Sequence, residues 1–125
     1  MSFANYLEDK VLDHVFGGTA FTQPSAWYVK LHTGDPGEAG TANAATETTR
    51  KSVTSWAASS GGSKASSAAV SWTSYPAAET ITHVSIWDAS TSGNCLGSGA
   101  LTASKTLAIG DTLTINSGSI TITLD

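Results

Sequence analysis

The amino-acid sequence predicts a mainly β protein, an antiparallel β-sandwich or jelly-roll-like barrel of about eight short strands with one short N-terminal α-helix. Three observations support this. Beyond Gly18 the apolar residues recur with a period of two, and short stretches rich in Gly and Ser separate them. Threonine, whose β-branched side chain suits the exposed face of a strand, occurs 18 times. The length, residues 1–125, predicts a single domain.

The helix is expected within residues 1–18, from Phe3 to Phe16, with Ser2 as its N-cap and Gly17-Gly18 at its end. Its apolar residues recur every four positions, at Phe3, Leu7, Val11 and Val15, and are flanked by Leu12 and Phe16. A helix this short is only marginally stable alone in water. We therefore expect it to pack either on its own sheet or on a partner chain.

The first clear strand is predicted at Trp27–His32, where Trp27, Val29 and Leu31 alternate with Tyr28, Lys30 and His32. The later strands are expected at Val53–Ala57, Ala68–Trp72, Ile81–Trp87, Asn94–Gly97, Gly99–Ala103, Leu107–Ile115 with a turn near Gly110-Asp111, and Ile120–Leu124. In the last of these, Ile120, Ile122 and Leu124 should face one way and the two threonines the other.

A long irregular loop is predicted over 33–49, because this stretch contains three glycines and a proline and almost no apolar side chain larger than Ala. Loops of this length are often functional or mobile. Within it, Asp35-Pro36-Gly37-Glu38 has the composition of a tight turn. A calcium site formed by Asp35, Glu38 and Glu47 is the less favoured interpretation of the same acids.

The composition argues against several classes of protein. Ser, Thr and Ala supply 18 residues each and Gly 12, together more than half of the chain, whereas only 13% of residues are charged. The formal net charge is −4, with no basic cluster beyond Arg50-Lys51, so we expect neither nucleic acid nor a membrane surface as a partner. No secretory signal is visible near Met1, which predicts synthesis in the cytoplasm.

No motif in the sequence predicts catalysis or cofactor binding. No serine lies in a Gly-x-Ser-x-Gly elbow, and the single Cys95 is expected to be a small buried residue. His14, His32 and His83 are too scattered for a metal motif. We therefore expect no enzyme activity, no catalytic, cofactor-binding or metal-binding residues and no cofactor. A small hydrolase whose two acids or Ser/His pair meet only in the fold is the enzymatic alternative.

Four tryptophans are many for this length, and they lie at Trp27, Trp56, Trp72 and Trp87. Each lies in a predicted strand, so we expect them to fill a core that is otherwise lined by small residues. The alternative is an exposed aromatic row, with Trp27, Tyr28 and Trp87, that stacks on carbohydrate.

Several segments together resemble a family of small structural proteins of tailed bacteriophages, labelled tail fibre or minor tail proteins or capsid decoration proteins. They are the helix Asn5–Phe16, the strand and turn Tyr28–Gly40, the run Thr82–Ala89 and the run Gly99–Lys105. The resemblance spans nearly the whole chain and rests on strand and turn sequences. It implies a virion component made in the bacterial cytoplasm.

From the resemblance and the uncharged surface we expect a capsid decoration (cement) protein, a homo-oligomer and specifically a trimer, that contacts the major capsid protein. The alternative is a tail fibre or minor tail protein that binds other tail proteins and touches the host surface. The helix and the 33–49 loop are the expected contact elements. The candidate interface residues are Phe3, Tyr6, Leu7, Asp35, Pro36 and Glu38.

Overall fold

The computed structural model describes residues 1–124, which form nine β-strands and one α-helix in antiparallel sheets. The elements are β1 (Ser2–Phe3), α1 (Asn5–Phe16), β2 (Tyr28–His32), β3 (Lys51–Ser52), β4 (Ser63–Ala65), β5 (Val70–Trp72), β6 (Glu79–Trp87), β7 (Cys95–Leu107), β8 (Leu113–Ile115) and β9 (Thr121–Thr123). The predicted fold class, a mainly β sandwich with a short N-terminal helix, is confirmed.

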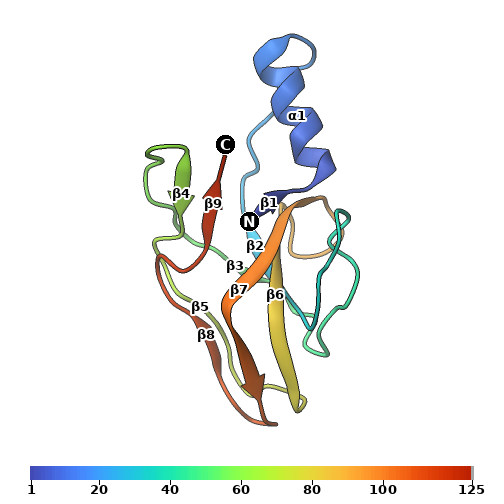
Figure 1. Cartoon of the computed structure of the whole chain (residues 1–125), viewed down its shortest axis with the longest axis vertical. Helices are drawn as coiled ribbons and strands as arrows, with labels where there is room; N and C mark the ends of the chain where they lie inside the picture. The colour runs from blue at the N-terminus through green and yellow to red at the C-terminus, as the bar shows by residue number, and fades with distance from the viewer. Residues whose placement is uncertain (125) are drawn as a thin grey trace.

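One five-stranded sheet, in the order β1-β7-β6-β2-β3, forms the main layer (Figure 1). Its centre is the long hairpin of β6 and β7, whose register shifts between Ile81 and His83. Two short strand pairs, β5–β8 and β4–β9, complete the sandwich. Figure 1 shows α1 extending away from the end of the main sheet where the N-terminus lies.

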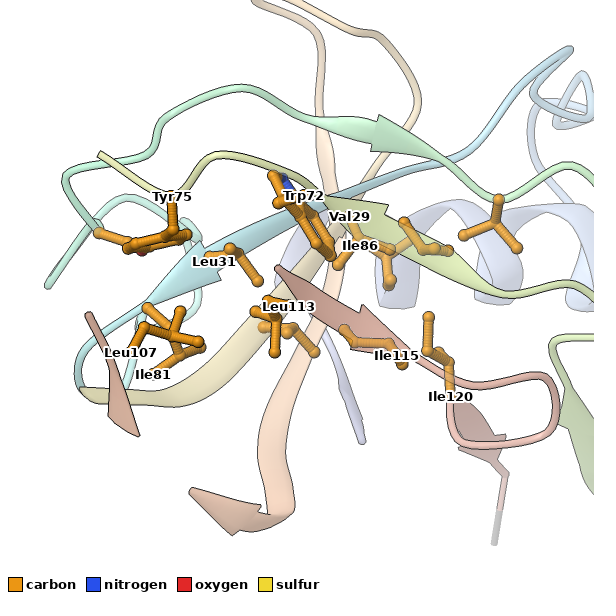
Figure 2. Packing of buried hydrophobic residues seen from close by; sticks show 14 of the residues in the cluster. Val29, Leu31, Trp72, Tyr75, Ile81, Ile86, Leu107, Leu113, Ile115 and Ile120 are labelled. Atoms are coloured by element: carbon orange, nitrogen blue, oxygen red, sulfur yellow. The ribbon is translucent and has the colours of Figure 1, made fainter. Parts of the chain in front are cut away.

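The core lies between the main sheet and the β5–β8 pair. Val29 and Leu31 of β2 and Ile86 of β6 are almost completely buried, and Trp72 of β5 packs with them (Figure 2). Leu113 of β8 and other apolar residues close the cluster. Of the set predicted to alternate inward, Trp27, Val29 and Leu31, the last two are thus confirmed, whereas Trp27 precedes β2, is only partly buried and packs against the edge of the core.

The start of the helix differs from the prediction. Ala4 is the N-cap residue and makes no side-chain cap bond, and Ser2 and Phe3 form strand β1 instead. β1 pairs with Gly97 and Ser98 of β7, and the amide of Ala4 also donates to the Leu96 carbonyl. Phe3 is therefore held in an extended conformation by the sheet, although it continues the four-residue apolar spacing of the helix.

Several strands differ from their predicted bounds. The expected Leu107–Ile115 strand is divided, with Leu107 ending β7 and only Leu113–Ile115 forming β8. The expected strands Asn94–Gly97 and Gly99–Ala103 are one continuous strand, β7, because Gly99 pairs with Val84 inside the ladder. The expected strand Val53–Ala57 is instead the short β3 just before it, followed by a single bridge at Trp56. Strand β4 was not predicted, because it begins at Ser63, inside a stretch whose Ser and Gly content is typical of a turn.

The 33–49 loop has the predicted bounds but is tied to the sheet. Its return limb lies along β2, where the Thr33 amide donates to the Asn43 carbonyl and the Ala45 amide to the Leu31 carbonyl. The predicted Asp35–Glu38 turn is confirmed, since the Asp35 carboxylate accepts a hydrogen bond from the Gly37 amide at 2.9 Å.

Two side chains do not face the side of their strand that the alternation predicts. His32 alternates with apolar residues as an outward residue would, yet it is fully buried because the return limb of the loop and β6 supply its hydrogen-bond partners. Leu124, expected inward beside Ile120, is exposed because it lies just beyond the end of β9.

Candidate interface: a projecting helix and an apolar groove

Helix α1 packs only loosely on its own fold, since none of its residues is buried. The chain that returns from the helix end contacts the face that carries Tyr6 and His14. There the Phe21 ring meets the Tyr6 ring edge-on at 6.5 Å, and the Phe21 amide donates to Nδ1 of His14 at 3.0 Å. The return segment therefore holds the helix in a fixed, projecting position.

The opposite face near the helix end is apolar and free in this chain. Leu12 is 55% exposed, Val15 60% and Phe16 81%. These residues stand at positions i, i+3 and i+4, so they share one face of the last turns. We call Leu12, Val15 and Phe16 the helix tip. Scattered apolar residues are common on surfaces, whereas three large ones on one face of a helix form an apolar patch of the kind that marks an interaction surface.

A large apolar groove opens beside the base of the same helix, with a volume of about 710 Å³. Residues from distant parts of the chain supply its apolar walls: Phe3, Leu7, Phe21, Trp27, Trp56 and Leu124. The serine- and glycine-rich turn 59–63 forms part of the rim. A groove of this size matches those that hold a protein side-chain cluster or a small ligand.

The four tryptophans divide between the core and this groove. Trp72 and Trp87 are buried, as predicted, and their indole nitrogens donate to the Thr49 carbonyl and the Ser85 hydroxyl. Trp27 and Trp56 are only half-buried and meet edge-on, with ring centroids 6.4 Å apart, in the groove wall. Among the described residues, no acceptor lies within hydrogen-bonding distance of the buried Nε1 of Trp56.

The six predicted interface residues have different environments. Phe3 and Leu7 line the groove, and Tyr6 lies under the return segment. Pro36 is completely buried inside its loop, while Asp35 and Glu38 are exposed there. Their role in an interface stays a prediction. The sequence analysis chose Phe3 and Leu7 as interface residues, and it named Leu12 and Phe16 only as residues that flank the apolar repeat. A four-residue repeat does not show which face of the helix the fold will cover, so the exposed helix tip was missed.

A serine and a histidine do meet in the structure, but inside the core. The Ser85 Oγ lies 2.8 Å from Nε2 of His32, and both residues are completely buried. Nδ1 of His32 lies 2.9 Å from the Ala42 carbonyl, which can only accept, so Nδ1 carries the proton and Nε2 accepts from Ser85. Since the Ser85 hydroxyl also accepts from the Trp87 indole, the arrangement is a closed hydrogen-bond chain without access for a substrate.

A second polar cluster anchors the 33–49 loop on β6. The Glu79 carboxylate accepts from the Tyr75 hydroxyl at 2.5 Å and from the amide and hydroxyl of Thr46 at 2.9 and 3.0 Å. Burial acts to raise the pKa of Glu79, but these hydrogen bonds outweigh it and lower the pKa below its usual value. Burial, followed by the contact with Glu79, raises the pKa of Tyr75.

The acids of the loop serve the loop itself. Asp35 caps its own turn, and the Glu47 carboxylate accepts from the Thr49 amide at 2.8 Å. Within residues 1–124, no three His, Cys, Asp or Glu side chains gather as metal ligands would. Cys95 is buried, as predicted, and burial raises the pKa of its thiol. Over the same described range, no helix combines the length and apolar character that a membrane span requires.

Comparison with known proteins gives one family. The family model described as "Podophage GP4 fiber I protein gp80" matches residues 2–123. The search of curated proteins finds no match. The match covers the helix, every strand and most residues of the groove, so it concerns the whole fold.

Proposed function

The chain belongs to the Podophage GP4 fiber I protein family, and on that premise we propose that it is a tail-fibre component that works by binding other proteins. Membership makes it a phage structural protein and a component of the virion. The observation that carries the proposal is the family match over residues 2–123. It favours the fibre alternative over the capsid decoration protein that we expected first.

The geometry supports a binding role. The large apolar surfaces lie on a projecting helix and in a groove, and the buried Ser85–His32 pair is closed to substrates. We propose that the protein acts without catalysis and without a cofactor. Its proposed partners are further copies of the chain and other tail proteins, with no part for nucleic acid or membrane, and it is made in the bacterial cytoplasm.

Labelling of virions tests the location. Antibodies against the purified protein, conjugated to gold and viewed on intact particles by electron microscopy, should mark the tail. Particles made without the gene serve as the control and should remain unlabelled. Label spread over the faces of the head would overturn the fibre assignment in favour of capsid decoration.

An adsorption assay tests contact with the host. If the protein forms a host-facing part of the fibre, purified protein added to host cells should compete with the phage and reduce its adsorption several-fold. Heat-unfolded protein is the control. Unchanged adsorption at saturating protein would contradict host contact and restrict the protein to the inner, structural part of the fibre.

A further inference from the structure

The helix tip and the apolar groove are the two large apolar surfaces of the described chain that remain uncovered, and they have opposite shapes. The helix tip is convex, with Phe16 at 81% exposure, while the groove is concave and walled by aromatic rings. Removal of large apolar side chains from water favours association. Each surface therefore has the chemistry to cover the other.

The helix tip cannot enter the groove of its own chain. Leu7 lies in the groove wall, and Phe16 is nine residues further along the same helix, which places it about 13 Å away along the axis. The return segment fixes the helix through Phe21, which itself lines the groove. Figure 1 shows the helix pointing away from the sheets. The occupant of the groove must come from another molecule.

The total surface agrees with a chain that has uncovered contact faces. It exposes 6712 Å². A compact monomer of 12.7 kDa should expose roughly 6,200 Å². The excess, about 500 Å², is what a projecting helix and an open groove add. In a head-to-tail contact one copy buries its helix tip and the other its groove, so this excess supplies part of the roughly 800 Å² per partner of a stable interface, and the surface around the two faces supplies the rest.

The charges near the two surfaces are complementary. Around the helix tip the exposed side of α1 carries the acids Glu8, Asp9 and Asp13. Of the described residues that line the groove, the side chain with a formal charge is Lys64, whose Nζ donates to the Ala57 carbonyl at the rim. An acidic helix with an apolar tip thus matches an apolar groove with a basic rim.

We propose that the helix tip of one copy inserts Leu12, Val15 and Phe16 into the apolar groove of a second copy. The contact is head-to-tail, because different surfaces of the two copies meet, so each copy has one surface left for a third. Repetition builds a closed ring or a filament, depending on the angle between copies. The inference rests on the self-association within the proposed function, and it holds whether the protein lies on the tail or the head.

Sedimentation velocity of the purified chain tests the contact. The wild type should form dimers or larger species at micromolar concentration. Phe16→Asp, on the helix tip, and Leu124→Asp, on the exposed edge of the groove, should each be monomers, with dissociation constants raised at least 100-fold. Ile109→Asp is the matched control: Ile109 is 75% exposed, lies on neither surface and should assemble like the wild type.

Mixing the two monomeric variants distinguishes a head-to-tail contact from a symmetric one. The Leu124→Asp copy keeps its helix tip and the Phe16→Asp copy keeps its groove, so an equimolar mixture should form a one-to-one dimer that grows no further. If Leu124→Asp and a second groove variant, Ser60→Glu, both assemble like the wild type while Phe16→Asp does not, the helices pack on one another and the proposal is wrong.

Two further results would contradict the head-to-tail contact. A wild type that stays monomeric at 100 µM would overturn the inference, and so would a groove that proves to hold a glycan or another virion protein in place of the helix tip. Circular dichroism shows whether each variant is folded, which is expected because the changed side chains are exposed. None of these results alters the labelling of virions, so a failure here is distinguishable from a failure of the fibre assignment.

Discussion

At the scale of single residues, the hydroxyl of Ser85 connects the buried polar groups of the core. It donates to His32 Nε2 and accepts from the Trp87 indole, each at 2.8 Å. Ser85→Ala should leave both partners buried and unsatisfied and lower the free energy of unfolding by about 1–3 kcal/mol. Urea denaturation measures this loss.

A second serine provides the comparison. Ser71 shares a hydrogen bond of 2.9 Å with Thr114 on the exposed surface, where water can replace the lost partner. Ser71→Ala should change the free energy of unfolding by less than about 0.5 kcal/mol. If the two alanine variants were equally stable, the buried chain of Ser85 would contribute nothing beyond an ordinary surface hydrogen bond.

At the scale of elements, β1 depends on the absence of a side chain at Gly97. A Cβ at that position would lie 2.6 Å from the Ser2 carbonyl oxygen, which is closer than any real contact. Gly97→Ala should push β1 off the sheet, lower the free energy of unfolding by about 1–3 kcal/mol and expose the Ala4 amide, which now donates to the Leu96 carbonyl.

Amide hydrogen exchange follows this detachment directly, because the Ala4 amide should exchange faster in Gly97→Ala than in the wild type. Ser98→Ala is the control, since Ser98 pairs with Ser2 in the same ladder and the change adds no atoms. Unchanged protection of Ala4 in the Gly97 variant would show that β1 accommodates a methyl group.

The turn between β6 and β7 depends on a side chain from a distant loop. Arg50 stacks on the Trp87 ring, with Cζ 3.7 Å from its centroid, and donates to the carbonyls of Ala89 and Ser92 at 2.9 and 2.7 Å. A lysine has neither the planar group to stack nor the fork of donors. Arg50→Lys should lower the free energy of unfolding by about 1–2 kcal/mol and increase amide exchange in residues 88–94. Lys105→Ala, on an exposed part of β7, is the control and should change neither quantity.

The sequence predicts these elements only where local pattern and tertiary environment agree. The alternation at 27–32 and the turn at Asp35–Glu38 depend on neighbours in the chain, so both were predictable. Strand β1 forms because Gly97, more than 90 positions away, leaves room for it, and no local pattern contains that information. The burial of His32 likewise depends on Ser85 and on the loop that returns past it.

At the scale of the whole molecule, the same limit applies to the candidate interface. The small, uncharged composition predicted a surface suited to close packing, and the resemblance predicted a virion protein. The groove is assembled from Phe3, Trp27, Trp56 and Leu124, which are spread over the whole chain, so only the fold brings them together. Which helix face is free follows from the path of the return segment, and residues 17–26 carry no periodic signal for it.

Acid should destabilise the whole fold through His32. Burial, the largest cause, lowers the pKa of His32 below its usual 6.5, with the charge of Lys30 acting in the same direction, so the folded protein holds the imidazole neutral. Above pH 6.5 the histidine is neutral in both the folded and unfolded states and its contribution to stability is complete. As the pH falls below 6.5 the unfolded chain binds a proton first, and stability is lost by up to about 1.4 kcal/mol per pH unit until the lowered folded pKa is reached.

His32→Gln isolates this effect, because the variant keeps the other titrating groups, including Glu79, whose lowered pKa affects stability only at more acidic pH. The free energy of unfolding of the wild type minus that of the variant should be constant above pH 7 and should shrink as the pH falls from 6.5 toward 5. Urea denaturation at half-unit pH steps measures the difference. A difference that stays flat across this range would mean that His32 becomes protonated as easily in the fold as in the unfolded chain, so the closed His32–Ser85–Trp87 chain must open to water.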